Sequence, residues 1–300
     1  MREVIPRRSP AGLRWGLLGV AAFSFTVPLT RVADGGLSPL FVGSGRAVVA
    51  GALAVLALAL TRQQLPQGKQ WLRLAVIAGG IVVGFPLLTS FALATAPASH
   101  GAVVVALLPA ATATAAVLRG RERPSAVFWA ATAVGALAAI GFAVVQSGGL
   151  GTIGVTDILL FGAVLAAAIG YAEGGLLARE LGAWQTVSWA LVVALPLMAV
   201  LAGATMASQP PSASPMQWAA FAYLGVVSMF LGYFAWYRGL ALGPMAPVSQ
   251  TQLVQPVLSL AWAWLLLGES LSWTTVLGGA AVVLCAGTAV RVRLAPPARP

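Results

Sequence analysis

Polar side chains that could bind a ligand are rare in this sequence, and several of them interrupt long apolar stretches. Gln250, Gln252 and Gln255 fall in one such stretch, and the last two, three residues apart, share a helix face. An amide both donates and accepts hydrogen bonds, so amides can bind both ends of a zwitterion. Hydrogen bonding between helices is the alternative, and it stabilises by only ~0.6–2 kcal/mol per contact. We favour a hydrated cavity wall.

Charged and titratable residues in apolar stretches are the next candidates. A membrane-buried carboxylate such as Glu173 costs up to ~3 kcal/mol unless it faces water or a partner. Glu173 could bind a substrate ammonium group, carry a proton or reach the interface. Arg46 could bind a substrate carboxylate, but we favour a structural ion pair, with Asp34 as candidate partner. His100, the only histidine, could act as a proton-coupled gate, although a water-exposed interfacial residue is the more common role.

Aromatic residues deep in the apolar stretches could stack on a planar, apolar substrate. Phe85, Tyr171 and Trp189 are the candidates, and core packing is the safer interpretation of any single one. Ser24 adds a fixed polar group to a cavity that we expect to be mostly apolar.

Other kinds of chemistry find no support in the residues. There is no G-x-x-x-x-G-K-[ST] phosphate loop, so ATP-driven pumping by this chain is not expected. With one histidine and one cysteine, Cys285, we expect no zinc cluster and no internal disulfide. The acidic residues form no obvious catalytic pair. We therefore expect that the protein binds no cofactor and no metal and is not an enzyme.

The elements that position these residues must be membrane helices. Hydrophobic residues make up 59% of the chain and charged residues 8%, against roughly 25% charged in soluble domains. A backbone crossing lipid must pair its own polar groups, so the expected class is an all-α membrane protein. The net charge is +10, and the basic residues lie between apolar runs without forming a face shared with aromatic residues. This argues against a nucleic-acid partner and for the lipid bilayer.

Ten apolar runs are near the ~20 residues that a helix needs to cross a bilayer. They are Leu13–Val32, Pro39–Thr61, Trp71–Thr95, Ser99–Leu118, Ser125–Gln146, Val155–Ala178, Trp184–Ala207, Met216–Leu242, Pro244–Leu267 and Ser272–Val292.

The distribution of arginine and lysine predicts the orientation. With the N-terminus in the cytoplasm, the internal connections hold Arg62, Lys69, Arg73, Arg119, Arg121, Arg123, Arg179, Arg291, Arg293 and Arg299, with Arg238 nearby. Four external connections hold none, and only Arg31 and Arg46 lie toward the outside. Because positive residues stay inside, we expect an inner (plasma) membrane protein with both termini cytoplasmic.

One segment occurs twice. LATAPASHGAVVVALLPAATATAAVLRGRERPS starts at Leu93, and LALGPMAPVSQTQLVQPVLSLAWAWLLLGESLS starts at Leu240. The ungapped match places Pro109 on Pro256 and Glu122 on Glu269. We expect the two internal prolines to act as hinges that free backbone carbonyls to line a cavity, and a packing kink without ligand contact is the equal alternative. Each half, residues 1–152 and 153–300, would hold five helices. Because five is odd, the second half starts on the other side of the membrane and is inverted relative to the first. Inverted repeats are typical of alternating-access carriers with a midplane site.

On these residues the chain resembles the drug/metabolite transporter superfamily and its ten-helix EamA-type carriers. The two hinge segments carry the resemblance, supported by Trp15-Gly16, Phe23-Ser24 and Gly45-Arg46, and it covers nearly the whole chain. Arg121 departs from the motif, which usually has glycine before the glutamate. The resemblance implies export or exchange of small metabolites, often amino acids, without ATP. Members that export aromatic amino acids are similar in length and aromatic content.

The sequence thus predicts a secondary transporter for a small amphipathic metabolite, most readily an aromatic or hydrophobic amino acid. The cavity would lie between the first four helices of each half, as the resemblance implies. The alternatives are a uniporter or channel-like facilitator, which would need a continuous polar ring, and a membrane enzyme. The sequence leaves open the oligomeric state, with a monomer plausible.

Overall fold

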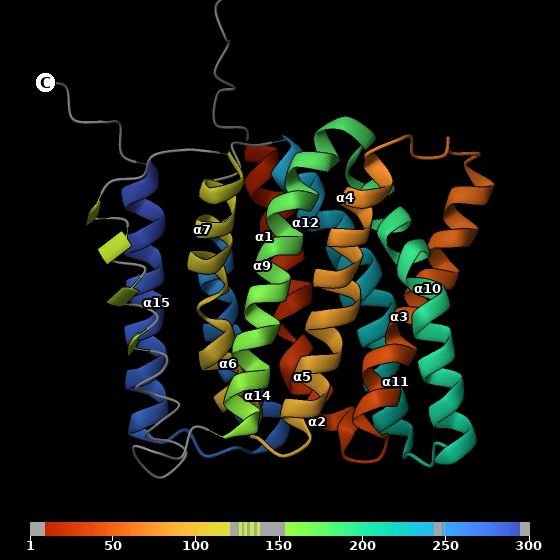
Figure 1. Cartoon of the computed structure of the whole chain (residues 1–300). Coiled ribbons are helices and arrows are strands. Elements are labelled where there is room, and N and C mark those ends of the chain that lie inside the picture. Colours follow the sequence, from red (N-terminus) through yellow and green to blue (C-terminus); the bar gives the residue numbers. More distant parts are fainter. Residues whose placement is uncertain are drawn as a thin grey trace, which may run out of the picture.

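The structure is a computed structural model that describes residues 10–120, 154–242 and 250–294, together with Val248 and a few residues between 126 and 138. The described elements are helices that stand side by side as a bundle (Figure 1). Their bounds are α1 Pro10–Ser24, α2 Thr26–Asp34, α3 Pro39–Leu60, α4 Gln70–Ile77, η1 Ala78–Gly84, α5 Phe85–Leu93, α6 Ala98–Val105, α7 Leu108–Gly120, α9 Val155–Leu181, α10 Ala183–Ser208, α11 Pro215–Tyr223, η2 Leu224–Leu231, α12 Gly232–Leu242, η3 Gln250–Leu253, α14 Val254–Leu267 and α15 Trp273–Leu294.

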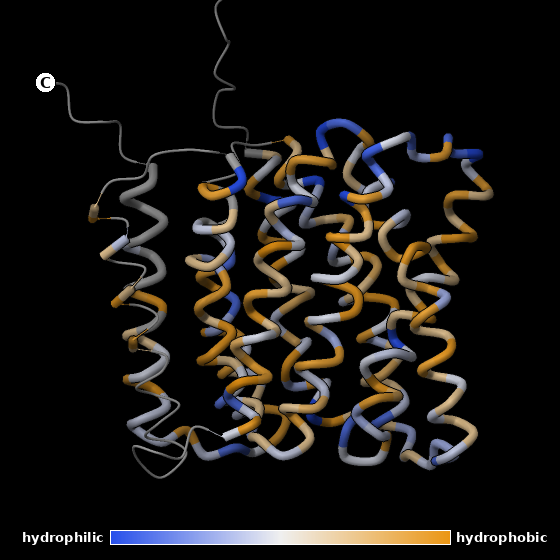
Figure 2. Tube along the Cα trace, in the orientation of Figure 1, coloured by the Kyte–Doolittle hydropathy of each residue, from blue (hydrophilic) through white to orange (hydrophobic). Residues whose placement is uncertain are grey.

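Seven helical stretches of the described chain are long and apolar enough to cross a membrane. They match seven of the ten predicted runs, and Figure 2 shows their largely hydrophobic length. The run Ser125–Gln146 falls mostly outside the described residues. The ninth run appears as a shorter apolar helix, Thr251–Leu267, and the tenth as α15, so the predicted count of ten is not confirmed.

The two ends of the bundle differ in charge. Arg62, Lys69, Arg119 and Arg179 lie where α3, α7 and α9 end and α4 begins, at the upper end in Figure 1. We call this the basic end. The other end, where α5 ends and α6 and α9 begin, is the opposite end.

The first span is broken between α1 and α2. Pro28 has no N–H and cannot donate to the carbonyl of Ser24, four residues earlier. That carbonyl instead accepts a hydrogen bond of 2.8 Å from the hydroxyl of Ser259 in α14. The break is thereby stabilised by a contact between the first span and a helix more than 200 residues away.

The spans that contain Pro109 and Pro256 are broken as well. Pro109 is the second residue of α7, and Pro256 the third residue of α14. Proline is tolerated in the first turn of a helix, where N–H groups have no intrahelical partner. The irregular backbone therefore precedes each proline, as the turn at Ala106 and Leu107 and the 3₁₀ segment η3. Hinge motion at these two prolines stays a prediction.

These two matched segments run in opposite directions. The carboxylate of Glu269, just after the end of α14, accepts hydrogen bonds of 2.7 and 2.9 Å from the backbone N–H groups of Ala98 and Ser99, at the start of α6. The end of one copy therefore lies against the beginning of the other.

Two spans carry a π-helical segment near the middle, η1 and η2, each in the third run of its half. In η1 the N–H of Phe85 donates to the carbonyl of Gly80, and the next residue, Pro86, has no N–H. The carbonyl of Ile81 is thus left without a helical donor, and it accepts a long hydrogen bond, 3.5 Å, from the hydroxyl of Tyr233. Such π-helical insertions occur frequently at functional sites.

Helices α1 and α12 pack backbone to backbone through glycine. A Cβ added at Gly239 would lie 2.7 Å from the nitrogen of Gly16 and 2.9 Å from the oxygen of Gly12. Neither backbone atom can move without shifting α1 as a whole. This contact fixes the position of the first span against the eighth predicted run.

We expect Gly239→Ala to lower the free energy of unfolding by about 1–3 kcal/mol, because overpacking forces α1 away from α12. The matched control is Gly203→Ala in α10, where an added Cβ meets nothing within 4 Å. That change replaces a poor helix former and should stabilise by up to about 1 kcal/mol. Thermal unfolding in detergent measures both, and equal melting temperatures for the two variants would contradict the close packing.

Candidate functional site

A small cavity lies in the middle of the bundle, where both halves of the chain meet. Its volume is about 20 Å³, enough for about one water molecule. Its lining residues come from nine elements: Phe23, Thr26, Arg46, Phe85, Pro86, Leu108, Tyr171, Ser228, Met229, Tyr233 and Gln255. We call it the central cavity.

Arg46 brings a positive charge to this cavity. It lies in α3 with 2% of its surface exposed. Its terminal nitrogens donate to the hydroxyls of Thr30 at 3.3 Å and Thr89 at 3.2 Å, while Nε has no hydrogen-bond partner. No ion pair within 4.0 Å involves Arg46 among the described residues, so the ion pair with Asp34 that the sequence favoured is absent. Asp34 still interacts electrostatically with Arg46 from beyond ion-pair distance. A buried guanidinium without a direct ion pair is costly, which makes Arg46 a candidate anion-binding group.

Aromatic rings surround this charge. The rings of Phe23 and Tyr233 are 4.9 Å apart between centroids, and those of Tyr171 and Tyr233 are 6.1 Å apart in a T-shaped pair. Across the cavity, the hydroxyls of Thr26 and Ser228 share a hydrogen bond of 2.7 Å. The lining therefore combines one cation, a few neutral polar groups and large apolar faces, which suits an amphipathic anion or zwitterion.

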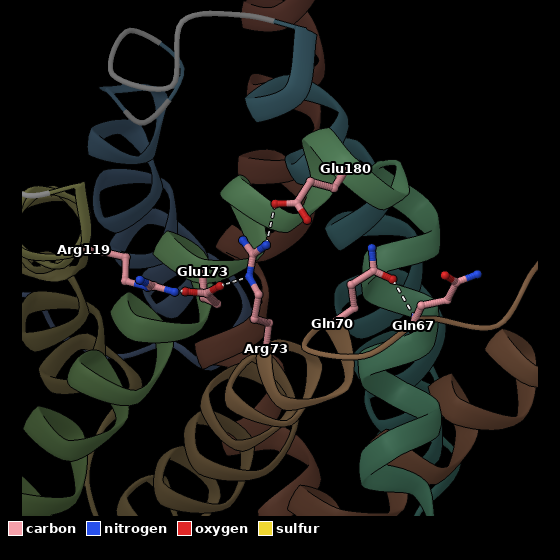
Figure 3. Close-up of polar contacts among 6 residues, drawn as sticks. All are labelled: Gln67, Gln70, Arg73, Arg119, Glu173 and Glu180. Carbon is pink, nitrogen blue, oxygen red and sulfur yellow. Dashed lines mark hydrogen bonds and ion pairs between the residues drawn. The ribbon is translucent and has the colours of Figure 1, made fainter.

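An ionic cluster joins the two halves at the basic end (Figure 3). Glu173 in α9 forms ion pairs with Nε of Arg73 from α4 and, at 2.7 Å, with Nε of Arg119 from α7. Arg73 also pairs with Glu180, which lies about two helical turns after Glu173 in α9. We call these four residues the basic-end cluster. It holds α4 and α7 against α9 between the central cavity and the basic end.

The halves are also joined at the opposite end. Nε2 of His100 in α6 lies 2.8 Å from Oδ1 of Asp157 in α9, and both side chains are buried. The second oxygen of Asp157 accepts from the N–H of Gly154 at 3.0 Å and so caps α9. Together with the carboxylate of Glu269, these contacts hold the start of α6 from the second half of the chain.

Of the predicted site residues, Phe85, Tyr171 and Gln255 line the central cavity. Glu173 and His100 do not, because Glu173 pairs with arginines and His100 contacts Asp157, each nearer an end of the bundle. Sequence periodicity places these residues on helices, but it does not show which distant partners they meet.

Ser24, Trp189 and Gln252 also lie away from the cavity lining. The hydroxyl of Ser24 accepts from Trp262 at 3.0 Å and donates to the carbonyl of Ala21, so it serves contacts between helices. Trp189 lines a pocket of about 500 Å³ at the basic end, with its ring 5.9 Å from that of Trp71. Gln252 is buried, and its amide makes no hydrogen bond with the described residues.

Arg46 and Tyr233 line the cavity but are not among the predicted site residues. The sequence signal for Arg46 is an arginine inside an apolar run, which also fits a structural ion pair. Nothing local marks Tyr233 among the other aromatic residues of its helix. The described residues contain no group of three or more His, Cys, Asp or Glu side chains able to hold a metal ion.

Comparisons with known proteins agree with this architecture. The profile of the EamA-like transporter family matches the chain twice, at residues 10–144 and 154–290. The "Uncharacterized transporter YdeK" of Bacillus subtilis (strain 168) is 42% identical over 276 residues, which cover 92% of this chain and 96% of that protein. A solved crystal structure is similar over 96% of this chain and 99% of its own, with a TM-score of 0.65 and 19% identity, a likeness of fold. The chain therefore belongs to the EamA-like transporter family, in the drug/metabolite transporter superfamily, and is a multi-pass membrane transporter.

Proposed function

We propose that the chain is a secondary transporter that exports or exchanges small amphipathic metabolites, with aromatic or hydrophobic amino acids as the favoured substrates. The single observation that carries the substrate class is Arg46, buried in an aromatic-lined cavity and without a direct ion pair among the described residues. Its guanidinium matches a carboxylate, which it can bind through two hydrogen bonds. Phe23, Phe85 and Tyr171 supply apolar faces for the substrate's side chain.

The polar contacts at the two ends support alternating access. The basic-end cluster closes one side of the cavity, and the contacts around His100, Asp157 and Glu269 close the other. Small-molecule sites usually measure ~300–1,000 Å³, so a cavity of about 20 Å³ must widen to admit an amino acid. A carrier that opens one set of contacts at a time would expose this site to one side of the membrane and then to the other.

Two inverted halves, residues 1–152 and 153–300, would account for this motion. The opposite directions of the two matched segments support the inversion, as do the paired breaks before Pro109 and Pro256. With positive residues inside, the basic end would face the cytoplasm of a bacterial-type inner membrane, with both termini on that side.

The test is transport in proteoliposomes that contain the purified full chain. A panel of labelled amino acids, aromatic, aliphatic, acidic and basic, is offered with and without a pH gradient. We expect uptake of aromatic or aliphatic amino acids, accelerated when unlabelled substrate is loaded on the other side. That counterflow identifies a carrier, whereas flux without acceleration would indicate a channel-like facilitator. No uptake of any amino acid would contradict the proposed substrate class.

A further inference from the structure

An apolar groove opens on the outer surface of the bundle, away from the central cavity. Its volume is about 830 Å³, and its walls come from α1, η2, α12, the end of α9 and the start of α10. Leu18, Leu231 and Leu242 line it and are about half exposed. Within a membrane span, such exposed apolar side chains face lipid chains rather than water.

A positive charge lies at the basic end of this groove. Arg238 is exposed and lines the groove, and its guanidinium carbon is 4.8 Å from the centre of the Trp15 ring. No ion pair involves Arg238 among the described residues. Stacking on an indole orients the guanidinium without neutralising it. Arg14, four residues before Leu18 on the same face of α1, is exposed at the same end.

We propose that this groove binds one anionic phospholipid, with an acyl chain along the apolar wall and the phosphate against Arg238. A guanidinium binds phosphate oxygens in a bidentate manner, and an indole is typical of headgroup depth. The apolar side chains of the groove between Arg238 and the pair Leu231 and Ala22 would then contact the acyl chain. Basic pockets between helices on the cytoplasmic side of membrane proteins bind anionic headgroups in this way. Two copies packed groove against groove would bring two arginines together without a carboxylate, because the groove lining holds apolar side chains and a cation.

The groove also touches parts that would move during transport. It follows η2, whose Ser228 and Met229 line the central cavity from the other side, and the end of α9, which carries the basic-end cluster. A bound lipid would therefore contact the same helix that forms one wall of the substrate site.

The experiment is native mass spectrometry of the purified full chain, titrated with phosphatidylglycerol or with phosphatidylcholine of the same acyl chains. We expect the wild type to hold one phosphatidylglycerol about fivefold more tightly than Arg238→Gln, the effect of one arginine near a membrane surface. Binding of phosphatidylcholine should be equal in the two proteins. Lys69→Gln, an exposed cation at the same end but outside the groove, should bind phosphatidylglycerol like the wild type.

Leu231→Trp provides a second variant, because a larger side chain fills the groove and should weaken the binding of both lipids. Equal affinity of the wild type and Arg238→Gln for phosphatidylglycerol would overturn the proposal. So would equal affinity of the wild type for both lipids, or a dimer in which the partner copy covers the groove and no lipid is retained.

Discussion

Glu173→Gln is expected to open the basic end of the protein. The substitution removes the carboxylate that bridges Arg73 and Arg119 among the described residues, so two guanidinium groups lose their shared counter-charge. Breaking a fully buried pair costs ~3–5 kcal/mol. Arg119 is more than half exposed and Arg73 keeps Glu180, so we expect about 2 kcal/mol here. A change of that size shifts the balance between closed and open basic ends by about 30-fold.

Cysteine labelling measures this shift. Cys285 is the only cysteine of the chain, so Cys285→Ala gives a background without thiols. Ile77→Cys then places one thiol four residues beyond Arg73, about 6 Å deeper along the helix, at a fully buried position. In that background we expect Glu173→Gln to raise the rate of labelling by a water-soluble maleimide by up to about 30-fold.

Glu180→Gln is the matched control within the same cluster. Glu180 also pairs with Arg73, but half of its side chain is exposed. Exposed ion pairs contribute ~0.2–1 kcal/mol, so labelling should rise by no more than about fivefold. If both variants labelled at the wild-type rate, the cluster would be a surface feature without control over access.

The membrane spans could be predicted from the sequence because their signal is local. The runs Leu13–Val32 and Trp71–Thr95 each correspond to a span in the structure, since twenty consecutive apolar residues have few other folds available. Hydropathy does not report the backbone within a span. The π segment η1 depends on the missing N–H of Pro86 and on the hydrogen bond that the Tyr233 hydroxyl donates to the carbonyl of Ile81. These two residues are 152 positions apart, so no local pattern marks their contact.

The site was predicted less well because its residues are defined by distant partners. Glu173 meets Arg119 and Arg73 across 54 and 100 residues, and neither distance leaves a pattern in the chain. Its position in an apolar run indicated only that the carboxylate needs water or a partner. Phe85, Tyr171 and Gln255 were placed on spans that do meet at the central cavity, although their contact with substrate stays a prediction.

Arg46→Gln is expected to weaken substrate binding by about 10–150-fold. Hydrogen bonds to a charged group contribute about 1.5–3 kcal/mol, and the substitution removes them and leaves a shorter, neutral amide. The equilibrium dissociation constant of the best substrate from the amino-acid panel is the quantity to measure. Arg46→Lys keeps the charge but not the planar fork, so its affinity should lie between those of the wild type and the glutamine variant.

The control for this prediction is Arg31→Gln. Arg31 also lies near the opposite end, but its guanidinium donates to the carbonyls of Leu93 and Ala94 at the end of α5, at 2.9 and 2.7 Å. It stabilises a helix end and does not line the central cavity. We expect Arg31→Gln to lower the melting temperature and to leave the affinity for substrate unchanged.

A pair of ligands separates recognition of the carboxylate from a purely structural role of Arg46. The ligands are the best amino acid and the corresponding amine, which lacks the carboxylate. If Arg46 binds that group, Arg46→Gln weakens the amino acid 10-fold or more and leaves the amine within about twofold, because the interaction energy belongs to the pair. If Arg46 only supports the fold, both ligands weaken together. The Nε of Arg46 has no hydrogen-bond partner among the described residues, so it is free to donate to a carboxylate if the proposed substrate binds there.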